Sequence, residues 1–185
     1  MGQSRRGGSA GAVLGAAVVT MGLIAGTFYI FSCGVMPGLA RSDDRVFIEV
    51  MQNTNDAFNN PVFFASFFGA LIFTAVSAWQ LRGTGPYRWV LAALVLYLIT
   101  FVITSAVNVP LNDQLADAGD PAKIADPAAV RETFEDPWLA WNAVRALLST
   151  VAISLLARAL VLRGRDNRAR QSAYLAPAAG SSASR

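Results

Sequence analysis

The stretch AGAVLGAAVVTMGLIAGTFYIFSCGV, residues 10–35, decides the fold of this chain, because it carries no charged side chain over the length of a membrane crossing. About 20 consecutive apolar residues allow a helix to span a bilayer. Three further, predominantly apolar runs of sufficient length follow at residues 61–81, 87–109 and 138–162. A basic start before an apolar run also describes a signal peptide, but this run is too long and three more follow it. We therefore predict an all-α fold, a four-helix transmembrane bundle whose first helix is retained.

The composition excludes several classes of protein. Of the 185 residues, 54% are hydrophobic and 15% are charged, and the length suits one domain. The chain has one cysteine, Cys33, and no histidine, so it cannot form an internal disulfide and lacks the commonest metal ligand and general base. No glycine-rich phosphate loop is present. We expect no metal, no cofactor and no nucleic-acid partner.

The charged residues are distributed unevenly between the two sides of a four-span arrangement. One side would hold ten arginines and a single acid, Asp166, whereas the other would hold four basic residues and eleven acids. Basic residues are retained in the cytoplasm. We therefore predict a multi-pass protein of the plasma membrane, with both termini in the cytoplasm and the two longer connections outside.

The chain divides into three parts around these spans. Residues 1–9 form a basic cytoplasmic N-terminus, and residues 10–162 form the membrane domain. Residues 163–185 are basic and then rich in Ala, Ser and Gly, so we expect a disordered cytoplasmic tail.

The first outer connection carries the pattern of a short amphipathic helix. Ser42 can cap such a helix. Apolar or small side chains then recur at helical spacing, at Phe47, Val50, Met51, Thr54 and Phe58. We expect this helix to lie against the outer membrane surface or over the mouth of the bundle.

Two features of the first and second spans have two interpretations each. Gly11 and Gly15, and then Gly22 and Gly26, are spaced so that helices can approach closely, either within the bundle or in a homodimer. The second span opens with four phenylalanines, which either face lipid and the core or form the wall of a pocket for a flat aromatic molecule. The four phenylalanines are Phe63, Phe64, Phe67 and Phe68. The sequence leaves both questions open.

The strongest functional signal lies at the outer ends of the third and fourth spans. The third span ends in NVPLND, residues 108–113, and the fourth begins with WLAWNAVR, residues 138–145. Pro110 removes a backbone donor, which predicts that the helix ends or kinks there. Arg145 would lie about 10 Å beyond Trp138, at a depth where arginine must snorkel, pair or face water.

Polar side chains form two stripes at helical spacing near Arg145. Trp138, Asn142, Arg145 and Ser149 share one face of the fourth span, and Thr100, Thr104 and Asn108 share one face of the third. These stripes predict a buried or cavity-lining polar cluster, which is a functional-site hypothesis. In the alternative, Arg145 pairs with Asp113 or another outer acid and stabilises the bundle, and Trp138 and Trp141 are interfacial anchors.

Four short motifs in this order resemble the anthrone oxygenase-like family of four-span membrane proteins. They are GVMPGL at residues 34–39, NNPVFF at 59–64, NVPLND at 108–113 and WxxWNxxR at 138–145, and the resemblance covers about residues 13–160. Much of this family is described only as a domain of unknown function. Some fungal members are implicated in oxidising anthrones to anthraquinones, and the resemblance implies that activity without a metal or flavin.

The resemblance suggests roles for individual residues in a cofactor-independent monooxygenase. Deprotonation of an anthrone gives an electron-rich anion that reacts with dioxygen, so such an enzyme needs a base, stabilisation of the oxyanion and a dry aromatic slot. Asp113, or water, would be the base. Asn60 and Phe64 of the NNPVFF segment are further candidates for substrate binding. We expect Arg145, Asn108, Asn112 and Asn142 to stabilise the anion, and Trp138 and Trp141 to stack on the substrate.

Two other classes of function remain open. The protein could be a non-catalytic membrane protein that binds a lipid or small hydrophobic molecule or assists a partner. A transporter would need polar groups that continue towards the inner side, and the sequence has few there. An enclosed pocket beside Arg145 favours catalysis, whereas a satisfied ion pair favours a scaffold.

Overall fold

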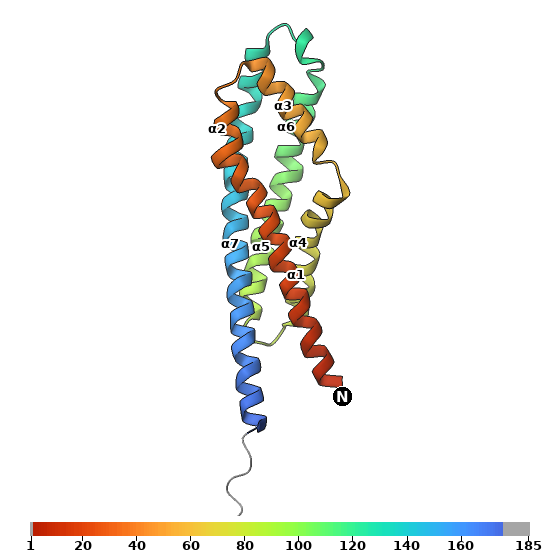
Figure 1. The fold of residues 1–185 in the computed structure, drawn as a ribbon, viewed down its shortest axis with the longest axis vertical. Coiled ribbons are helices and arrows are strands. Elements are labelled where there is room, and N and C mark those ends of the chain that lie inside the picture. The colour runs from red at the N-terminus through yellow and green to blue at the C-terminus, as the bar shows by residue number, and fades with distance from the viewer. Residues whose placement is uncertain (1, 176–185) are drawn as a thin grey trace, which may run out of the picture.

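The fold is known from a computed structural model that describes residues 2–175, and every regular element in that range is a helix (Figure 1). The elements in chain order are α1 (Gly2–Ile30), η1 (Phe31–Val35), α2 (Met36–Leu39), α3 (Asp44–Ala57), α4 (Pro61–Gln80), α5 (Tyr87–Ile103), η2 (Thr104–Asn108), α6 (Val109–Asp117), η3 (Pro121–Lys123) and α7 (Pro127–Leu175). Segments η1 and η2 are π-helical, and η3 is a 3₁₀ turn. The predicted all-α fold is confirmed.

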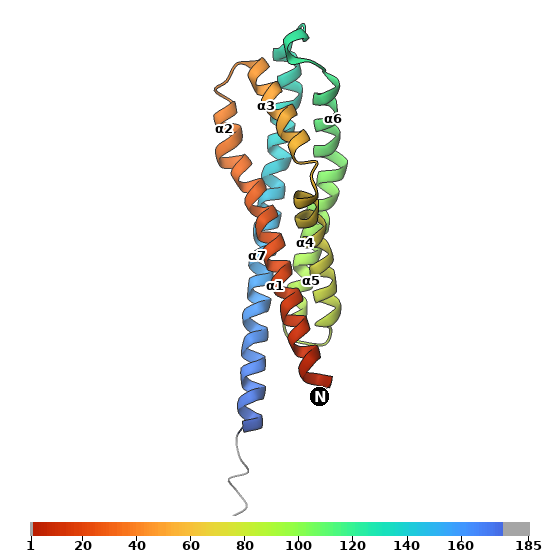
Figure 2. The same ribbon diagram turned by 45° about the vertical axis from the view of Figure 1, so that its right-hand side comes forward.

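Four helical segments are long and apolar enough to cross a membrane. They are Ser9–Leu39, Pro61–Gln80, Tyr87–Asp117 and Pro127–Ala169. The start of α1 and the end of α7 lie at the same end of the bundle, and α3 lies at the other, which we call the α3 end (Figures 1 and 2). The predicted four-span bundle therefore agrees with the structure.

The helices extend beyond several predicted boundaries. α7 begins at Pro127 rather than at residue 138 and continues to Leu175. Residues 163–175, which we expected to be disordered, are therefore helical, whereas residues 176–185 lie outside the described residues. A long amphiphilic helix can continue past the membrane boundary because its intrahelical hydrogen bonds need no lipid environment.

The third span continues past Pro110 to Asp117, so of the two predicted outcomes, an end or a kink of the helix, the end does not occur. Proline lacks an N–H and crowds the carbonyl four residues before it. The π-helical η2 lies directly before this point, and the Val109 N–H bonds to the Thr104 carbonyl in the wider π register. The same arrangement occurs in the first span, where η1 precedes Pro37. Each wider turn allows the helix to continue past its proline.

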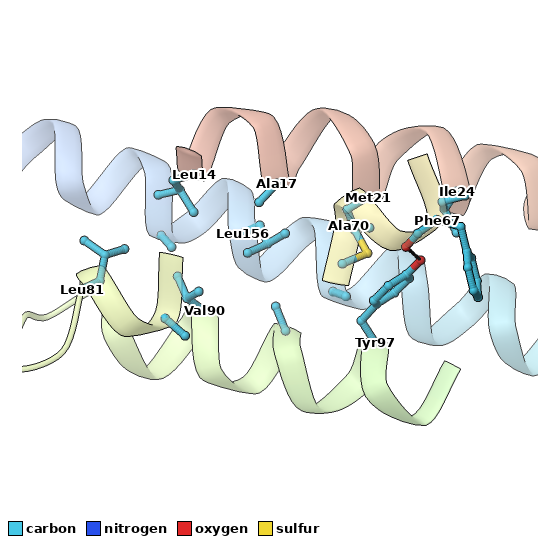
Figure 3. Close-up of a cluster of buried hydrophobic side chains, with 14 of the residues drawn as sticks. Leu14, Ala17, Met21, Ile24, Phe67, Ala70, Leu81, Val90, Tyr97 and Leu156 are labelled. Atoms are coloured by element: carbon cyan, nitrogen blue, oxygen red, sulfur yellow. Dashed lines mark hydrogen bonds between the residues drawn. The ribbon is translucent and has the colours of Figure 1, made fainter. Parts of the chain in front are cut away.

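A buried apolar core joins α1, α4, α5 and α7 in the middle of the bundle (Figure 3). Leu14, Met21 and Leu156 are fully buried in it. The Tyr97 hydroxyl donates a 2.8 Å hydrogen bond to the Phe67 carbonyl and so ties α5 to α4. A Cβ added at Gly22 would lie 2.9 Å from Ile153 Cδ1, so this glycine serves close packing of α1 on α7. The homodimer remains a prediction.

The predicted amphipathic helix is present as α3, and it lies over the end of the bundle (Figure 2). Its cap residue is Asp43 rather than Ser42, and no side chain caps it. Val50 is exposed, and Ile48 is buried in its place. Eight buried side chains pack there and form what we call the cap cluster: Phe31, Met36, Phe47, Ile48, Met51, Leu115, Phe134 and Trp138.

Polar contacts fix α3 to the rest of the α3 end. Arg131 of α7 donates hydrogen bonds of 2.9 Å to the Asp44 carboxylate and to the Ser42 carbonyl. Gln52 donates to the carbonyls of Leu115 and Gly119. Arg45 donates to the carbonyls of Pro121 and Ile124. α3 is therefore an ordered cover over the bundle.

Candidate functional site

A cavity of about 260 Å³ lies between the apolar core and the cap cluster. This volume is close to the lower end of the range for small-molecule sites, about 300 Å³. Its aromatic lining consists of Phe28, Phe31, Phe58, Phe63, Phe64, Phe67, Phe68, Phe101 and Trp138. Its other lining residues are Thr27, Asn55, Asn59, Thr104, Ser105, Asn108, Val109, Asn112, Asn142 and Arg145. The site is a largely aromatic chamber with a few polar groups.

Arg145 lies at the cavity with 5% of its surface exposed. Its Nη2 donates to Asn142 Oδ1 at 3.0 Å and its Nη1 to Thr104 Oγ1 at 3.4 Å. The guanidinium carbon lies 4.3 Å from the centre of the Phe28 ring and 5.6 Å from that of Trp138. Its Nε is buried without a hydrogen-bond partner. The cation is therefore held by aromatic faces and neutral oxygens.

No carboxylate pairs with Arg145 within residues 2–175. The ion pairs there join Lys123 to Asp120, and Arg131 to Asp44 and Glu135. Asp113 is exposed on α6 and does not line the cavity. The alternative in which Arg145 pairs with Asp113 therefore does not hold. A buried charge without a counter-ion is costly, and a bound anion would remove that cost.

Asn142 joins Arg145 to the first helix. Its Nδ2 donates to the Phe28 carbonyl at 2.9 Å and to Ser32 Oγ at 2.8 Å, while its Oδ1 accepts from Arg145. The side chain is fully buried. Asn142 thus fixes the position of the guanidinium relative to α1 and η1.

A second set of polar contacts lies where α7 meets η2 and α6. Trp138 Nε1 donates to Asn112 Oδ1 at 2.8 Å, and Asn108 Nδ2 contacts the Trp138 carbonyl at 3.4 Å. The Asn108 Oδ1 and the Asn55 Nδ2 are buried without partners. Two donors, Asn55 Nδ2 and Arg145 Nε, and one acceptor, Asn108 Oδ1, are therefore unsatisfied among the lining residues. Such groups are expected where a polar ligand completes the site.

The four phenylalanines of α4 line the cavity, although Phe67 also belongs to the apolar core and Phe64 and Phe68 are partly exposed, so both interpretations of the sequence apply. The Phe63 and Phe67 rings stack at 5.9 Å with 13° between their planes. Phe67 and Phe101 stack at 5.1 Å with 19° between theirs. Phe63, Phe67 and Phe101 therefore contribute a row of three nearly parallel rings to the chamber lining, and such an arrangement suits a flat ligand.

The structure brings together most of the predicted site residues but not all of them. Asn108, Asn112, Trp138, Asn142, Arg145 and Phe64 line the cavity. Trp141 is 40% exposed and lies outside it. Asn60 caps α4, where its Oδ1 accepts from the N–H groups of Val62 and Phe63 at 3.0 Å. Asn60 thus supports the fold rather than the chamber.

The sequence patterns did not identify Phe31 or Ser105 of the two π-helical segments as lining residues, whereas Thr104 and Asn108 belong to the predicted polar stripe. η1 supplies Phe31, and η2 supplies Thr104, Ser105 and Asn108. π-helical turns occur frequently at functional sites. The available signal was a proline two residues beyond the end of each segment, Pro37 after η1 and Pro110 after η2. Within residues 2–175, no group of three or more Cys, Asp and Glu side chains is arranged to hold a metal ion.

Comparison with protein families gives one match. The family model described as anthrone oxygenase matches residues 55–155, which is more than half of the chain. The matched range contains every cavity-lining residue except Thr27, Phe28 and Phe31. No curated protein and no solved structure matches the chain.

Proposed function

Because the chain belongs to the anthrone oxygenase family, we propose that it oxidises a flat phenolic, polyketide-type substrate with dioxygen in the chamber beside Arg145. One observation carries this proposal. Arg145 is buried among aromatic rings without a carboxylate partner in the described part of the chain. A substrate anion with a planar ring system would supply both the missing negative charge and a partner for the rings.

The proposed reaction uses the substrate as its own reductant. Arg145 stabilises the oxyanion formed when the substrate loses its acidic C–H proton. The electron pair of the anion reduces dioxygen, and a carbon–oxygen bond forms to give a hydroperoxide. Loss of the second C–H proton breaks the O–O bond and releases hydroxide. One anthrone and one dioxygen thus give one anthraquinone and one water, and no separate reductant is needed.

The proton acceptor in this proposal is water. Of the two candidates, Asp113 and water, Asp113 does not line the chamber, and the chamber's described lining residues include no carboxylate. Arg145 lowers the pKa of a bound carbon acid by favouring its anion, so a weak base suffices. The Asn108 amide would position the substrate, and the Asn142 amide would position Arg145.

We predict that Asp113→Asn retains full turnover. Asp113 is exposed on α6, outside the chamber, so loss of its charge should change the kcat/KM for anthrone by less than twofold. Steady-state quinone formation by the purified variant tests this. A loss of more than tenfold would restore Asp113 as the base. Asp117→Asn, at another exposed acid of α6, is the matched control.

The proposed function itself is tested by oxygen uptake of the full chain reconstituted in liposomes and supplied with anthrone. We expect uptake above the spontaneous rate in protein-free liposomes, with one quinone formed per dioxygen consumed. Uptake equal to that of protein-free liposomes would contradict the oxygenase.

A second candidate function is binding without catalysis of a small hydrophobic molecule. The observation that favours it is the absence of any acid–base side chain other than Arg145 among the lining residues. Tight binding of an aromatic acid without oxygen uptake would establish this alternative.

We further propose that the α3 end, and with it the chamber, faces the outside of the plasma membrane. The support is the arginine content of the opposite end, where the turn between α4 and α5 lies at the same end as the start of α1 and the end of α7 (Figure 1). Arg82 is in that turn, Arg88 is in the first turn of α5, and Arg163 is in the last third of α7.

A further inference from the structure

Four exposed side chains that line the chamber lie within the spans, on α4 and on the η2–α6 segment. They are Phe64 and Phe68 on α4, and Ser105 and Val109 on η2 and α6, and we call these four residues the rim. Phe64, Phe68 and Val109 are 41%, 45% and 43% exposed, and Ser105 is also exposed. We propose that the substrate passes through this rim directly from the lipid and therefore belongs to the class of neutral, bilayer-dissolved aromatic acids. This inference rests on the proposed function and specifies its substrate.

The rim lies within segments that cross the membrane. Ser105 and Val109 belong to the span Tyr87–Asp117, and Phe64 and Phe68 belong to Pro61–Gln80. Phe68 is about 10 Å along the helix from Pro61, at 1.5 Å per residue. Neighbouring Val102 is 60% exposed and does not line the chamber. Apolar side chains exposed within a span face acyl chains, so the rim opens into lipid.

The end of the chamber nearest to water is covered. The Phe58 ring, in the turn between α3 and α4, packs on Phe31 at 5.8 Å and on Phe63 at 4.9 Å. The contacts of Arg45, Gln52 and Arg131 fix α3 above it. Asn59, in the same turn, is the exposed lining residue on this side. A route from water would therefore pass Asn59, at the edge of this cover.

Polarity increases from the rim to the interior. Three of the four rim side chains are apolar and exposed, whereas the lining residues Arg145, Asn142 and Asn108 are polar and buried. A charged molecule would lose its hydration in the lipid before it reached the compensating guanidinium. A neutral acid avoids that cost and ionises only beside Arg145, where the anion is stabilised. The route therefore selects uncharged precursors for a site that binds anions.

The test measures association of 1,8-dihydroxyanthraquinone, a flat product-like probe that does not consume oxygen, with the full chain in liposomes. Stopped-flow quenching of tryptophan fluorescence reports the rate. Ser105→Phe and Val109→Phe fill the rim from two positions. Val102→Phe adds the same ring to the lipid-facing surface beside the rim, and Asn59→Phe obstructs the route from water.

We expect both rim variants to slow association at least tenfold, while Val102→Phe and Asn59→Phe stay within twofold of the wild type. Slow association in Asn59→Phe with unchanged rates in the rim variants would overturn passage from the lipid. Unchanged association rates in all four variants would also overturn passage from the lipid. In either case, binding by the wild type would leave the proposed function intact. If the wild-type protein bound no probe at all, the proposed function would fail, and the inference with it.

Discussion

Arg145→Met should abolish anthrone oxidation while leaving the bundle at least as stable as the wild type. Removal of a single preorganised oxyanion donor typically lowers the rate by about 10²–10³, and Arg145 is the only charged side chain among the described residues that line the chamber. Methionine retains much of the length and apolar volume of arginine. Because it also removes a buried cation without a carboxylate partner in the described residues, the melting temperature should stay equal or rise.

The kcat/KM for anthrone and the melting temperature of the reconstituted variant test both parts of this prediction. The control is Arg158→Met, an exposed arginine of the same helix, which should leave both quantities unchanged. If Arg145→Met melted far below the wild type, Arg145 would be a structural element of the bundle. Retention of more than a third of wild-type turnover would remove it from the chemistry.

Asn142→Leu should damage both stability and function, in contrast to Arg145→Met. The change leaves the Phe28 carbonyl and Ser32 without their donor and deprives Arg145 of its 3.0 Å acceptor. Loss of several buried hydrogen bonds, at about 1 kcal/mol each or somewhat more, should lower the free energy of unfolding by about 2–4 kcal/mol. The guanidinium would also lose its fixed position, so we expect the kcat/KM for anthrone to fall by about 10².

Denaturant titration in detergent micelles measures the stability of this variant, and quinone formation measures its activity. Ser149→Ala is the matched control, because Ser149 is equally buried on the same face of α7 and its Oγ has no hydrogen-bond partner. That control should be neutral or slightly stabilising. An Asn142→Leu variant as stable as Ser149→Ala would show that the contacts of Asn142 contribute little.

The bundle itself could be predicted from the sequence because lipid imposes a strong and local constraint. A backbone that crosses a bilayer must satisfy its hydrogen bonds internally, and each crossing needs a long apolar run. The polar face of the fourth helix was predictable for a similar reason. Trp138, Asn142 and Arg145 follow helical spacing, and all three are buried at the chamber.

The position of Asp113 outside the chamber depended on helix rotation, which sequence spacing alone did not fix. Asn112 and Asp113 are neighbours, but successive residues of a helix point about 100° apart. Asn112 bonds to Trp138 inside the bundle, and Asp113 is therefore directed outwards. The π-helical turns at η1 and η2 alter the rotation further, because each changes the register that a regular helix would keep.

The sequence by itself thus determined the four helices, the family resemblance and the polar face that carries Arg145. Only the tertiary structure decided that Arg145 has no carboxylate partner in the described chain, that α3 covers the chamber and that Phe28, Phe31 and Phe101 complete its aromatic wall. The physical reason is the range of the interactions. Hydrophobic length and helical period are properties of a local segment, whereas the chamber forms from side chains of separate helices whose contacts depend on packing and rotation.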